Sequence, residues 1–429
     1  MKRYVTVIAI TAICCDVIFA ALEPQLKLVW EKEFSFEDDK SSCISKAWLN
    51  KQNVIEFAGF SFITKEPQSG CIYTGSIDHE GGITKKLIGK APDYKFWAKM
   101  TSNSILAVYK YNGRLKMVGE FRPSRSKTTE PLKPLHEIKG VILYETPNFK
   151  PTDYGIRTTV TDSYVSDNGI YYCGINHPGG CVFKMDMYNK LRWLREIDYN
   201  QTCAVNDMSA VENEGIYIVG ISGESESKFG LKSPADIFVR KYDFDGNFKG
   251  EYTFETGLGT FNFPVISAAK SGAAISYLDT EPVTSEKGNN QQTQQTCPGN
   301  GVKFTGEGMS LCQKITMLDT SLKHKWTARV TDTENAMIEN KTVLGSNCVF
   351  GYTDIIGQKD STILSVYSLE GNRICSEKIN FIAATVEIFA ITDSNNTQSC
   401  ILLGKGIQTD KTEKTMTFTI KAARIELIE

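Results

Sequence analysis

Three residues with metal-binding chemistry lie close together in this chain: Cys173, His177 and Cys181, in the sequence CGINHPGGC. Thiolate sulfur and imidazole nitrogen are preferred ligands of zinc. However, no second Cys or His pair follows at metal-binding spacing, and the Pro-Gly-Gly step is typical of a turn. We therefore predict no metal ligand and no cofactor.

A second candidate is Asp243-Phe244-Asp245-Gly246-Asn247, where carboxylates alternate ahead of glycine as they do in calcium loops. The distal bidentate glutamate of an EF-hand is missing, and the segment falls between two strand-like runs. We interpret it as a hairpin turn, because Asp-Gly-Asn readily supplies positive φ angles.

Signatures of catalysis are mostly absent. The four histidines (His79, His136, His177 and His324) lie in no zinc-protease motif, and the chain has no Gly-x-Ser-x-Gly elbow, phosphate loop or dinucleotide glycine run. A carboxylate pair for glycoside hydrolysis stays open, since such acids come from loops far apart in sequence. We name no catalytic residue, and the sequence leaves open whether the protein is an enzyme.

The elements around these candidates follow a repeat. A short apolar run ending in glycine recurs at 54–59 (VIEFAG), 169–174 (GIYYCG), 215–220 (GIYIVG), 347–351 (NCVFG) and 400–404 (CILLG). Such runs are too short for helices and rich in β-branched and aromatic residues, which predicts strands. Repetition on this scale predicts one small antiparallel meander stacked on copies of itself.

The stretch 215–254, which contains ADIFVRKYDFDGNFKGEYTF, resembles the repeats of bacterial "seven-bladed β-propeller" proteins. The other copies match only in outline, at CIYTGSIDHEGGI, CVFKMDMYNK and ILSVYSLEGN. The resemblance implies a propeller blade and brings no catalytic residue with it. We expect an all-β chain forming a single β-propeller of about seven four-stranded blades, with six or eight also open.

Two polar segments, near 122–135 and 281–309, do not fit the repeat, and we predict them to be surface insertions. Residues 1–21 follow the order of a signal peptide: a basic flank, a short apolar run and small residues at Ala20 and Ala21. We therefore expect a secreted, extracellular propeller domain over 22–429, without a membrane span after cleavage. A net charge of -2 gives no indication of a nucleic-acid partner.

Cysteine usage fits the same compartment. Ten cysteines lie beyond the predicted signal, and an even number in a secreted chain predicts disulfides. We expect two bridges within single repeats, Cys43 with Cys71 and Cys297 with Cys312. Asn200, Asn340 and Asn395 begin Asn-x-Thr sequences and are candidate glycosylation sites.

The tryptophans Trp30, Trp193 and Trp326 recur near the starts of repeats, which favours packing between blades over sugar stacking. We expect strands at both chain ends to meet in the same or adjacent blades, because open edges invite aggregation.

Two functions remain. The first is a monomeric, non-enzymatic module that binds an extracellular protein or glycan through the loop face. The second is a secreted hydrolase or lyase with carboxylates at the channel. Three or more acids converging on the channel mouth would favour the enzyme, and an apolar or plugged channel would favour binding.

Overall fold

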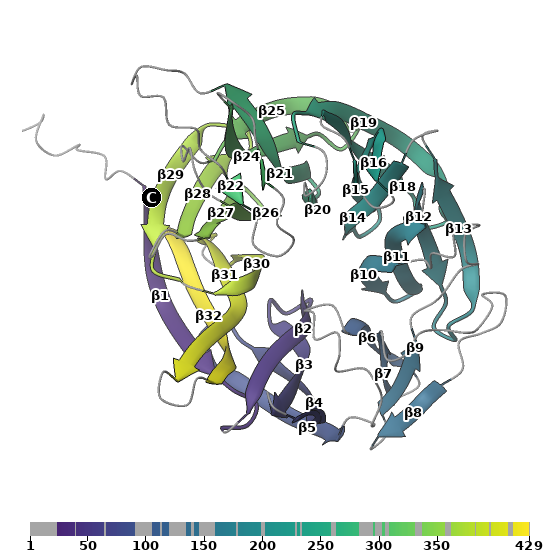
Figure 1. Cartoon of the computed structure of the whole chain (residues 1–429), viewed down its shortest axis with the longest axis vertical. Helices are drawn as coiled ribbons and strands as arrows, with labels where there is room; N and C mark the ends of the chain where they lie inside the picture. The colour runs from purple at the N-terminus through teal and green to yellow at the C-terminus, as the bar shows by residue number, and fades with distance from the viewer. Residues whose placement is uncertain are drawn as a thin grey trace, which may run out of the picture.

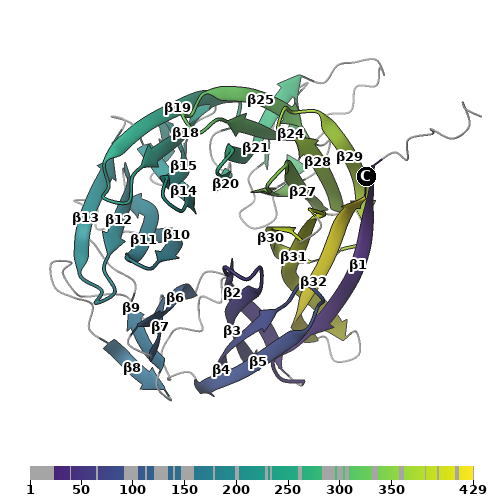
Figure 2. The same ribbon diagram turned by 180° about the vertical axis from the view of Figure 1, so that it is seen from behind.

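The computed structural model describes residues 24–38, 40–63, 66–90, 105–111, 114–119, 134–138, 141–145, 159–176, 179–198, 202–227, 230–231, 234–258, 263–282, 295–296, 303–304, 309–330, 337–356, 362–381, 383–393, 396–410 and 415–428. Every regular element within these ranges is a β-strand. None of them contains a helix of the length and apolarity needed to cross a membrane. The predicted signal peptide, 1–21, lies outside the described residues. The described strands are arranged in a ring of sheets (Figures 1 and 2).

Among the described residues, six regular blades are four-stranded antiparallel meanders. The strands of each blade are given in order from the centre of the ring outwards. They are β2 (Ser41–Leu49), β3 (Ile55–Ile63), β4 (Glu66–Ile77) and β5 (Ile83–Lys90); β10 (Thr159–Ser166), β11 (Gly169–Asn176), β12 (Gly179–Met185) and β13 (Leu191–Ile197); β14 (Thr202–Val211), β15 (Gly215–Gly223), β18 (Ala235–Tyr242) and β19 (Phe248–Thr256); β20 (Val265–Ala269), β21 (Gly272–Pro282), β24 (Met309–Leu318) and β25 (His324–Arg329); β26 (Met337–Leu344), β27 (Cys348–Ile356), β28 (Thr362–Ser368) and β29 (Arg373–Ile379); and β30 (Ala384–Thr392), β31 (Gln398–Asp410), β32 (Thr415–Ile428) and β1 (Gln25–Phe34).

A further four-stranded sheet of different topology occupies the ring between β2–β5 and β10–β13 (Figure 1). Its order is β6 (Ile105–Tyr111), β7 (Arg114–Gly119), β9 (Val141–Glu145) and β8 (Pro134–Ile138), and β7 pairs with β9 in parallel. The prediction of a single all-β propeller of four-stranded blades is confirmed. The six regular blades lie within the range that the sequence left open.

The predicted insertions are described only in part. Within 281–309, β22 (Gln295–Thr296) pairs with β23 (Lys303–Phe304), and most of the remaining segment lies outside the described residues. Residues 120–133, which make up most of the other insertion, also lie outside them. A second short ribbon, β16 (Ser225–Ser227) with β17 (Gly230–Leu231), extends from the β15–β18 connection.

The glycine-ended runs occupy equivalent places, as predicted. They form β15, β27 and β31, each the second strand from the channel in its blade. Along β15 every residue is buried, because this strand is covered by the neighbouring blade on each face. A side chain at Gly220 would collide with the Ala204 carbonyl and the Phe238 ring, so this position requires glycine.

The Asp243 segment is a turn, as interpreted from sequence. Asp243 Oδ1 accepts hydrogen bonds from the backbone amides of Asp245 (3.0 Å) and Asn247 (2.8 Å), and Gly246 has a φ of 80°. Trp193 on β13 of the preceding blade covers this turn and donates from Nε1 to the Phe244 carbonyl at 3.3 Å. Trp30 and Trp326 contact the turns of their next blades in the same way, which confirms their predicted role.

The two ends of the chain close the ring. Strand β1 pairs antiparallel with β32, from Gln25 opposite Ile428 to Phe34 opposite Ile420. The N-terminal strand thus becomes the outermost strand of a blade whose other three strands are C-terminal (Figures 1 and 2). The predicted meeting of the termini in one blade is confirmed.

Candidate functional site

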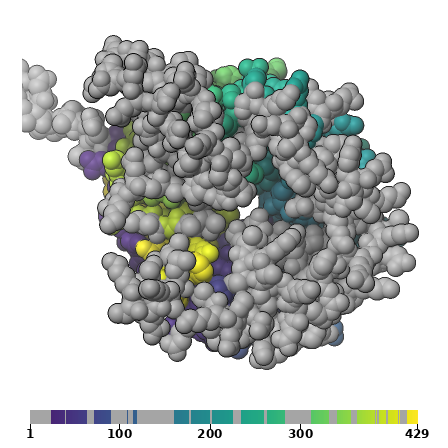
Figure 3. All heavy atoms as spheres, in the orientation of Figure 1, coloured from purple at the N-terminus to yellow at the C-terminus, as the bar shows by residue number. Residues whose placement is uncertain are grey.

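The centre of the ring holds a cavity of about 530 Å³. Its wall is formed mainly by the innermost strands β2, β10, β14, β20, β26 and β30, with contributions from β11 and β31. The recess at the middle of the ring is visible in Figure 3. A volume of this size is within the range of small-ligand sites.

A repeated β-bulge sets which side chains face this cavity. The pairing register shifts between Ile44 and Lys46 on β2, between Val160 and Asp162 on β10, and between Val205 and Asp207 on β14. Strand β30 has a similar irregularity before Glu387. Since bulges re-aim side chains, each charged residue after the irregularity borders the channel.

Two of the lining carboxylates have lysine partners. Lys46 Nζ lies 2.7 Å from Asp162 Oδ1, and Lys341 Nζ lies 3.7 Å from Glu387 Oε1. A third lysine of the wall, Lys405, lies with Nζ 3.6 Å from the centroid of the Phe418 ring. The channel is therefore neither apolar nor plugged by apolar side chains along its described wall.

Asp207 is held differently. Its Oδ2 accepts the Ile266 backbone amide at 2.8 Å, which joins β14 to the next blade. Among the described residues, no lysine, arginine or histidine forms an ion pair with it. Burial and the neighbouring Asp162 carboxylate raise the pKa of Asp207 to about 8, although Lys341 opposes the rise. At neutral pH this carboxyl group is thus mostly protonated and can donate a hydrogen bond.

The cavity wall that includes Asp207 also includes an aromatic residue and an amide residue. Phe263 borders the cavity with 62% of its surface exposed, and Pro264 follows it. Asn206 is the extra residue of the β14 bulge, and its buried Oδ1 has no hydrogen-bond partner among the described residues. An exposed ring beside polar groups is the usual composition of a site for a small amphipathic ligand.

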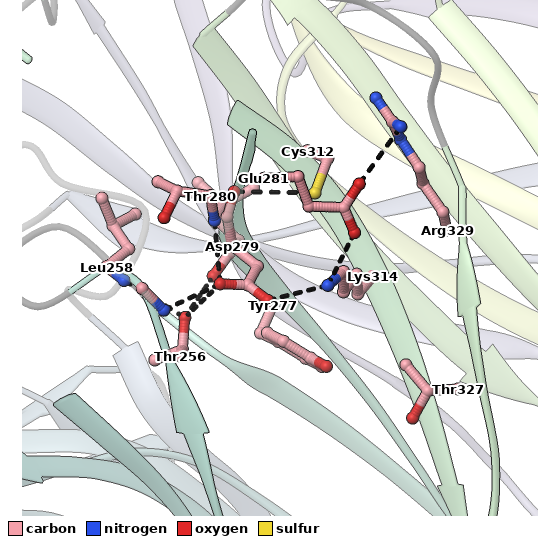
Figure 4. Close-up of polar contacts among 12 residues, drawn as sticks. Thr256, Leu258, Tyr277, Asp279, Thr280, Glu281, Cys312, Lys314, Thr327 and Arg329 are labelled. Atoms are coloured by element: carbon pink, nitrogen blue, oxygen red, sulfur yellow. Dashed lines mark hydrogen bonds and ion pairs between the residues drawn. The ribbon is translucent and has the colours of Figure 1, made fainter. Parts of the chain in front are cut away.

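A second polar cluster lies at the edge of the β20–β25 blade and is shown in Figure 4. Lys314 Nζ bridges Asp279 (2.9 Å) and Glu281 (2.8 Å), and Arg329 Nη1 lies 3.1 Å from Glu281. Asp279 also accepts the Gly257 amide at 2.8 Å from the preceding blade. Because its charges are mutually paired, we assign this cluster to blade packing.

The sequence-predicted disulfide Cys43–Cys71 is wrong in this structure, because no bridge joins these cysteines. Cys43 lies on β2 and Cys71 on β4, with β3 between them. Two strand spacings amount to about 9.5 Å, beyond the roughly 7 Å that a disulfide can span between Cα atoms. Cys312 is buried on β24, whereas Cys297 lies outside the described residues, so that pair stays a prediction.

The structure describes only two of the three residues considered as metal ligands. Cys173 and Cys181 lie on adjacent strands, but His177 lies outside the described residues. Within the described ranges, no group of three His, Cys, Asp or Glu side chains is arranged to hold a metal.

Of the glycosylation candidates, Asn200 and Asn395 also lie outside the described residues. Asn340 is only 8% exposed, and its Nδ2 donates to Ser276 Oγ at 3.2 Å. The folded protein therefore buries the Asn340 side chain, and its glycosylation stays an untested prediction.

Sequence reasoning missed the channel residues. A usable signal was a small polar residue followed by a charged one, ahead of each glycine-ended run: Ser45-Lys46, Thr161-Asp162 and Asn206-Asp207. The repeat shows that these positions are equivalent in different blades. However, the side chains line the channel because of the β-bulge, which the sequence does not reveal.

Comparisons with known proteins give only a distant structural likeness. Neither a protein-family model nor a curated protein matches the chain. Among solved structures, it is similar to a subtype N11 neuraminidase-like protein of A/flat-faced bat/Peru/033/2010 (H18N11), with 9% sequence identity and a TM-score of 0.42. The match covers 94% of this chain and 93% of that chain. A likeness this distant carries nothing about substrate or activity.

Proposed function

We propose that this protein is a secreted, monomeric, non-enzymatic propeller that binds a glycan at its central channel. The observation that supports this most is the exposed Phe263 ring beside the polar wall of the cavity. A sugar ring has an apolar face that packs on aromatics and hydroxyl groups that pair with carboxyl, amide and ammonium groups.

The size of the cavity favours a glycan over a protein partner. A stable protein interface covers about 800 Å² of each partner, usually on a broad surface. A hollow of about 530 Å³ instead suits one or two sugar units. Loops at the channel mouth would then add contacts to the rest of the chain of sugars.

The proposal is tested by removing the aromatic ring of Phe263. Phe263→Ala should weaken glycan binding about ten-fold, because it removes the stacking surface. Phe248→Ala is the matched control, since Phe248 is 57% exposed but lies on the outermost strand β19. Calorimetric titration with trisaccharides measures both variants. If both substitutions weakened glycan binding equally, or if neither weakened it, the result would count against a binding site in the channel.

A hydrolase or lyase is the second candidate. Three acids line the channel and its described wall is not apolar, which meets the condition expected of an enzyme. A protonated Asp207 close to the Asp162 carboxylate resembles the acid and base of glycoside hydrolysis. Against this, Asp162 and Glu387 are ion-paired with lysines, which reduces their availability as base or nucleophile. Release of reducing sugar from a bound glycan, abolished by Asp207→Asn, would favour the enzyme.

A further inference from the structure

The described acids of the channel wall differ in their cation partners. Lys46 neutralises Asp162, and Lys341 lies against Glu387, whereas Asp207 has no ion pair with a described residue. Asp207 lines the cavity and is half-buried. Its Oδ2 is taken by the Ile266 amide, so Oδ1 is the oxygen left for a ligand.

Burial is the main cause of the raised pKa of Asp207, and the nearby charges add to it. Asp162 on β10 and Glu387 on β30 raise the pKa of this carboxyl group, and Lys341 on β26 lowers it by less than Asp162 raises it. Lys46 on β2 is occupied by Asp162, and Lys405 on β31 lies against the Phe418 ring. Asp207 therefore retains its proton near neutral pH first because it is buried and second because carboxylates outweigh the lysine around it, and this excess of carboxylates also favours a cation beside Asp207.

An aromatic ring on the same cavity wall adds to this preference. Phe263 and Pro264 belong to the wall that also carries Asp207 and Asn206. Exposed aromatic rings attract ammonium groups through their negative faces. We infer that the glycan bound in the channel is an amino sugar with a free, protonated amine, whose ammonium group pairs with Asp207. This inference rests on the proposed glycan-binding function and names the chemical class of the sugar.

Proton release follows from this arrangement. In the free protein below pH 8, Asp207 carries a proton. An ammonium group beside Asp207 favours the carboxylate, so the proton leaves Oδ1 for solvent as the ligand enters. At pH 6.5, binding should release about one proton per ligand. A neutral sugar in the same place should release none.

The experiment compares three trisaccharides by calorimetry at pH 6.5, in two buffers with different ionisation enthalpies. The probes are the glucosamine trimer, the N-acetylglucosamine trimer and maltotriose. The full-length protein should bind the glucosamine trimer at least ten-fold more tightly than the other two, and with proton release. Asp207→Asn should abolish both the preference and the release, while its amide oxygen still accepts the Ile266 amide.

Asp167→Asn is the matched control, because it removes one carboxylate at a position whose side chain is 89% exposed. This variant should keep both the preference and the proton release. Equal affinity for the N-acetylated trimer, or an unchanged preference in Asp207→Asn, would overturn the amine inference, and the channel would still bind a sugar through Phe263. Failure of all three probes to bind would overturn the proposed function together with the inference.

Discussion

Lys46 on β2 and Asp162 on β10 form an ion pair, with 2.7 Å between Nζ and Oδ1, although the sheet that begins with β6 lies between their blades (Figure 1). The same ammonium group donates to the Ser163 carbonyl at 3.2 Å. Two regular blades are therefore joined directly at the channel wall, across the sheet with the parallel pair. This contact connects the stability of the ring with the charge of the cavity.

Replacing Lys46 should cost stability because it leaves the Asp162 carboxylate without its cation. We expect Lys46→Met to lower the free energy of unfolding by about 1–3 kcal/mol, measured by urea denaturation at pH 7. Lys51→Met is the control, since its side chain is 72% exposed and its ion pairs are long, at 3.6 and 3.9 Å. The control should change stability by less than about 0.5 kcal/mol. Similar losses in both variants would contradict the bridging role of Lys46.

Asp207 should make the fold less stable as the pH rises. Its pKa is about 8 in the folded protein and near 3.8 in the unfolded chain, so between these values the folded state binds the extra proton. Stability from this group is therefore fully present below about pH 4 and is lost as the pH rises to 8. Asp207→Asn removes that dependence.

The free energy of unfolding of Asp207→Asn, relative to that of the unsubstituted protein, should increase by about 1–2 kcal/mol as the pH is raised from 5 to 8. This magnitude is reduced to account for solvent screening at the channel. Urea denaturation of both proteins at the two pH values measures this difference. Asp167→Asn should show no such trend, because its carboxylate is exposed. A constant difference between Asp207→Asn and the unsubstituted protein would mean that Asp207 ionises normally.

The scaffold could be predicted from sequence because each repeat carries its own local signals. The apolar run and the glycine at its end identify the second strand of a blade, as at Gly220, and the Asp243 turn identifies a hairpin. The irregular sheet could not be predicted, because a parallel pair such as β7 with β9 depends on a crossover and leaves no short-range pattern.

The candidate site in the channel could not be predicted from the sequence for a related reason. Lys46, Asp162, Asp207 and Glu387 come from different blades, and a long stretch of sequence separates the first from the last. A one-residue bulge decides whether such a side chain faces the channel or the next blade, since strand residues alternate in direction. The disulfide prediction failed because sequence spacing cannot show that β3 intervenes between Cys43 and Cys71.

The tryptophan contacts between blades can be tested through Gly246. A Cβ at this residue would lie 2.7 Å from the Trp193 ring, at a φ of 80°. We expect Gly246→Ala to cost about 2–3 kcal/mol in urea denaturation, and about 1 kcal/mol less when Trp193→Ala is also present, because the collision is then relieved. Gly250→Ala is the control, since its Cβ would meet only Leu322 at 3.7 Å. Additive effects of Gly246→Ala and Trp193→Ala would show that the Trp193 side chain does not collide with a side chain at residue 246.

The thiols of the folded protein should react slowly. Burial raises the pKa of Cys43 and Cys375 to about 11, so at pH 8 only about one thiol in a thousand is ionised. We expect slow alkylation by iodoacetamide in the native state and rapid alkylation in urea without reductant, counted by mass spectrometry. Cys375, which is half-buried, should react before the buried Cys400. Cysteines other than Cys297 and Cys312 that react in urea only after reduction would show disulfides that are absent among the described residues.

Closure of the ring gives the last prediction. Deleting residues 421–429 removes every β1–β32 pair except Phe34 with Ile420 and leaves the hydrogen bonds of β1 without partners. It also strips Ala423, Ile425 and Leu427 from the core shared with β28 and β31. We therefore expect a single, cooperative thermal transition at a temperature lowered by several degrees, followed by circular dichroism. Removal of Glu429 alone keeps the Gln25–Ile428 pair and should leave the transition unchanged. If the long deletion melted at the original temperature, the pairing of the two chain ends would not hold the ring together.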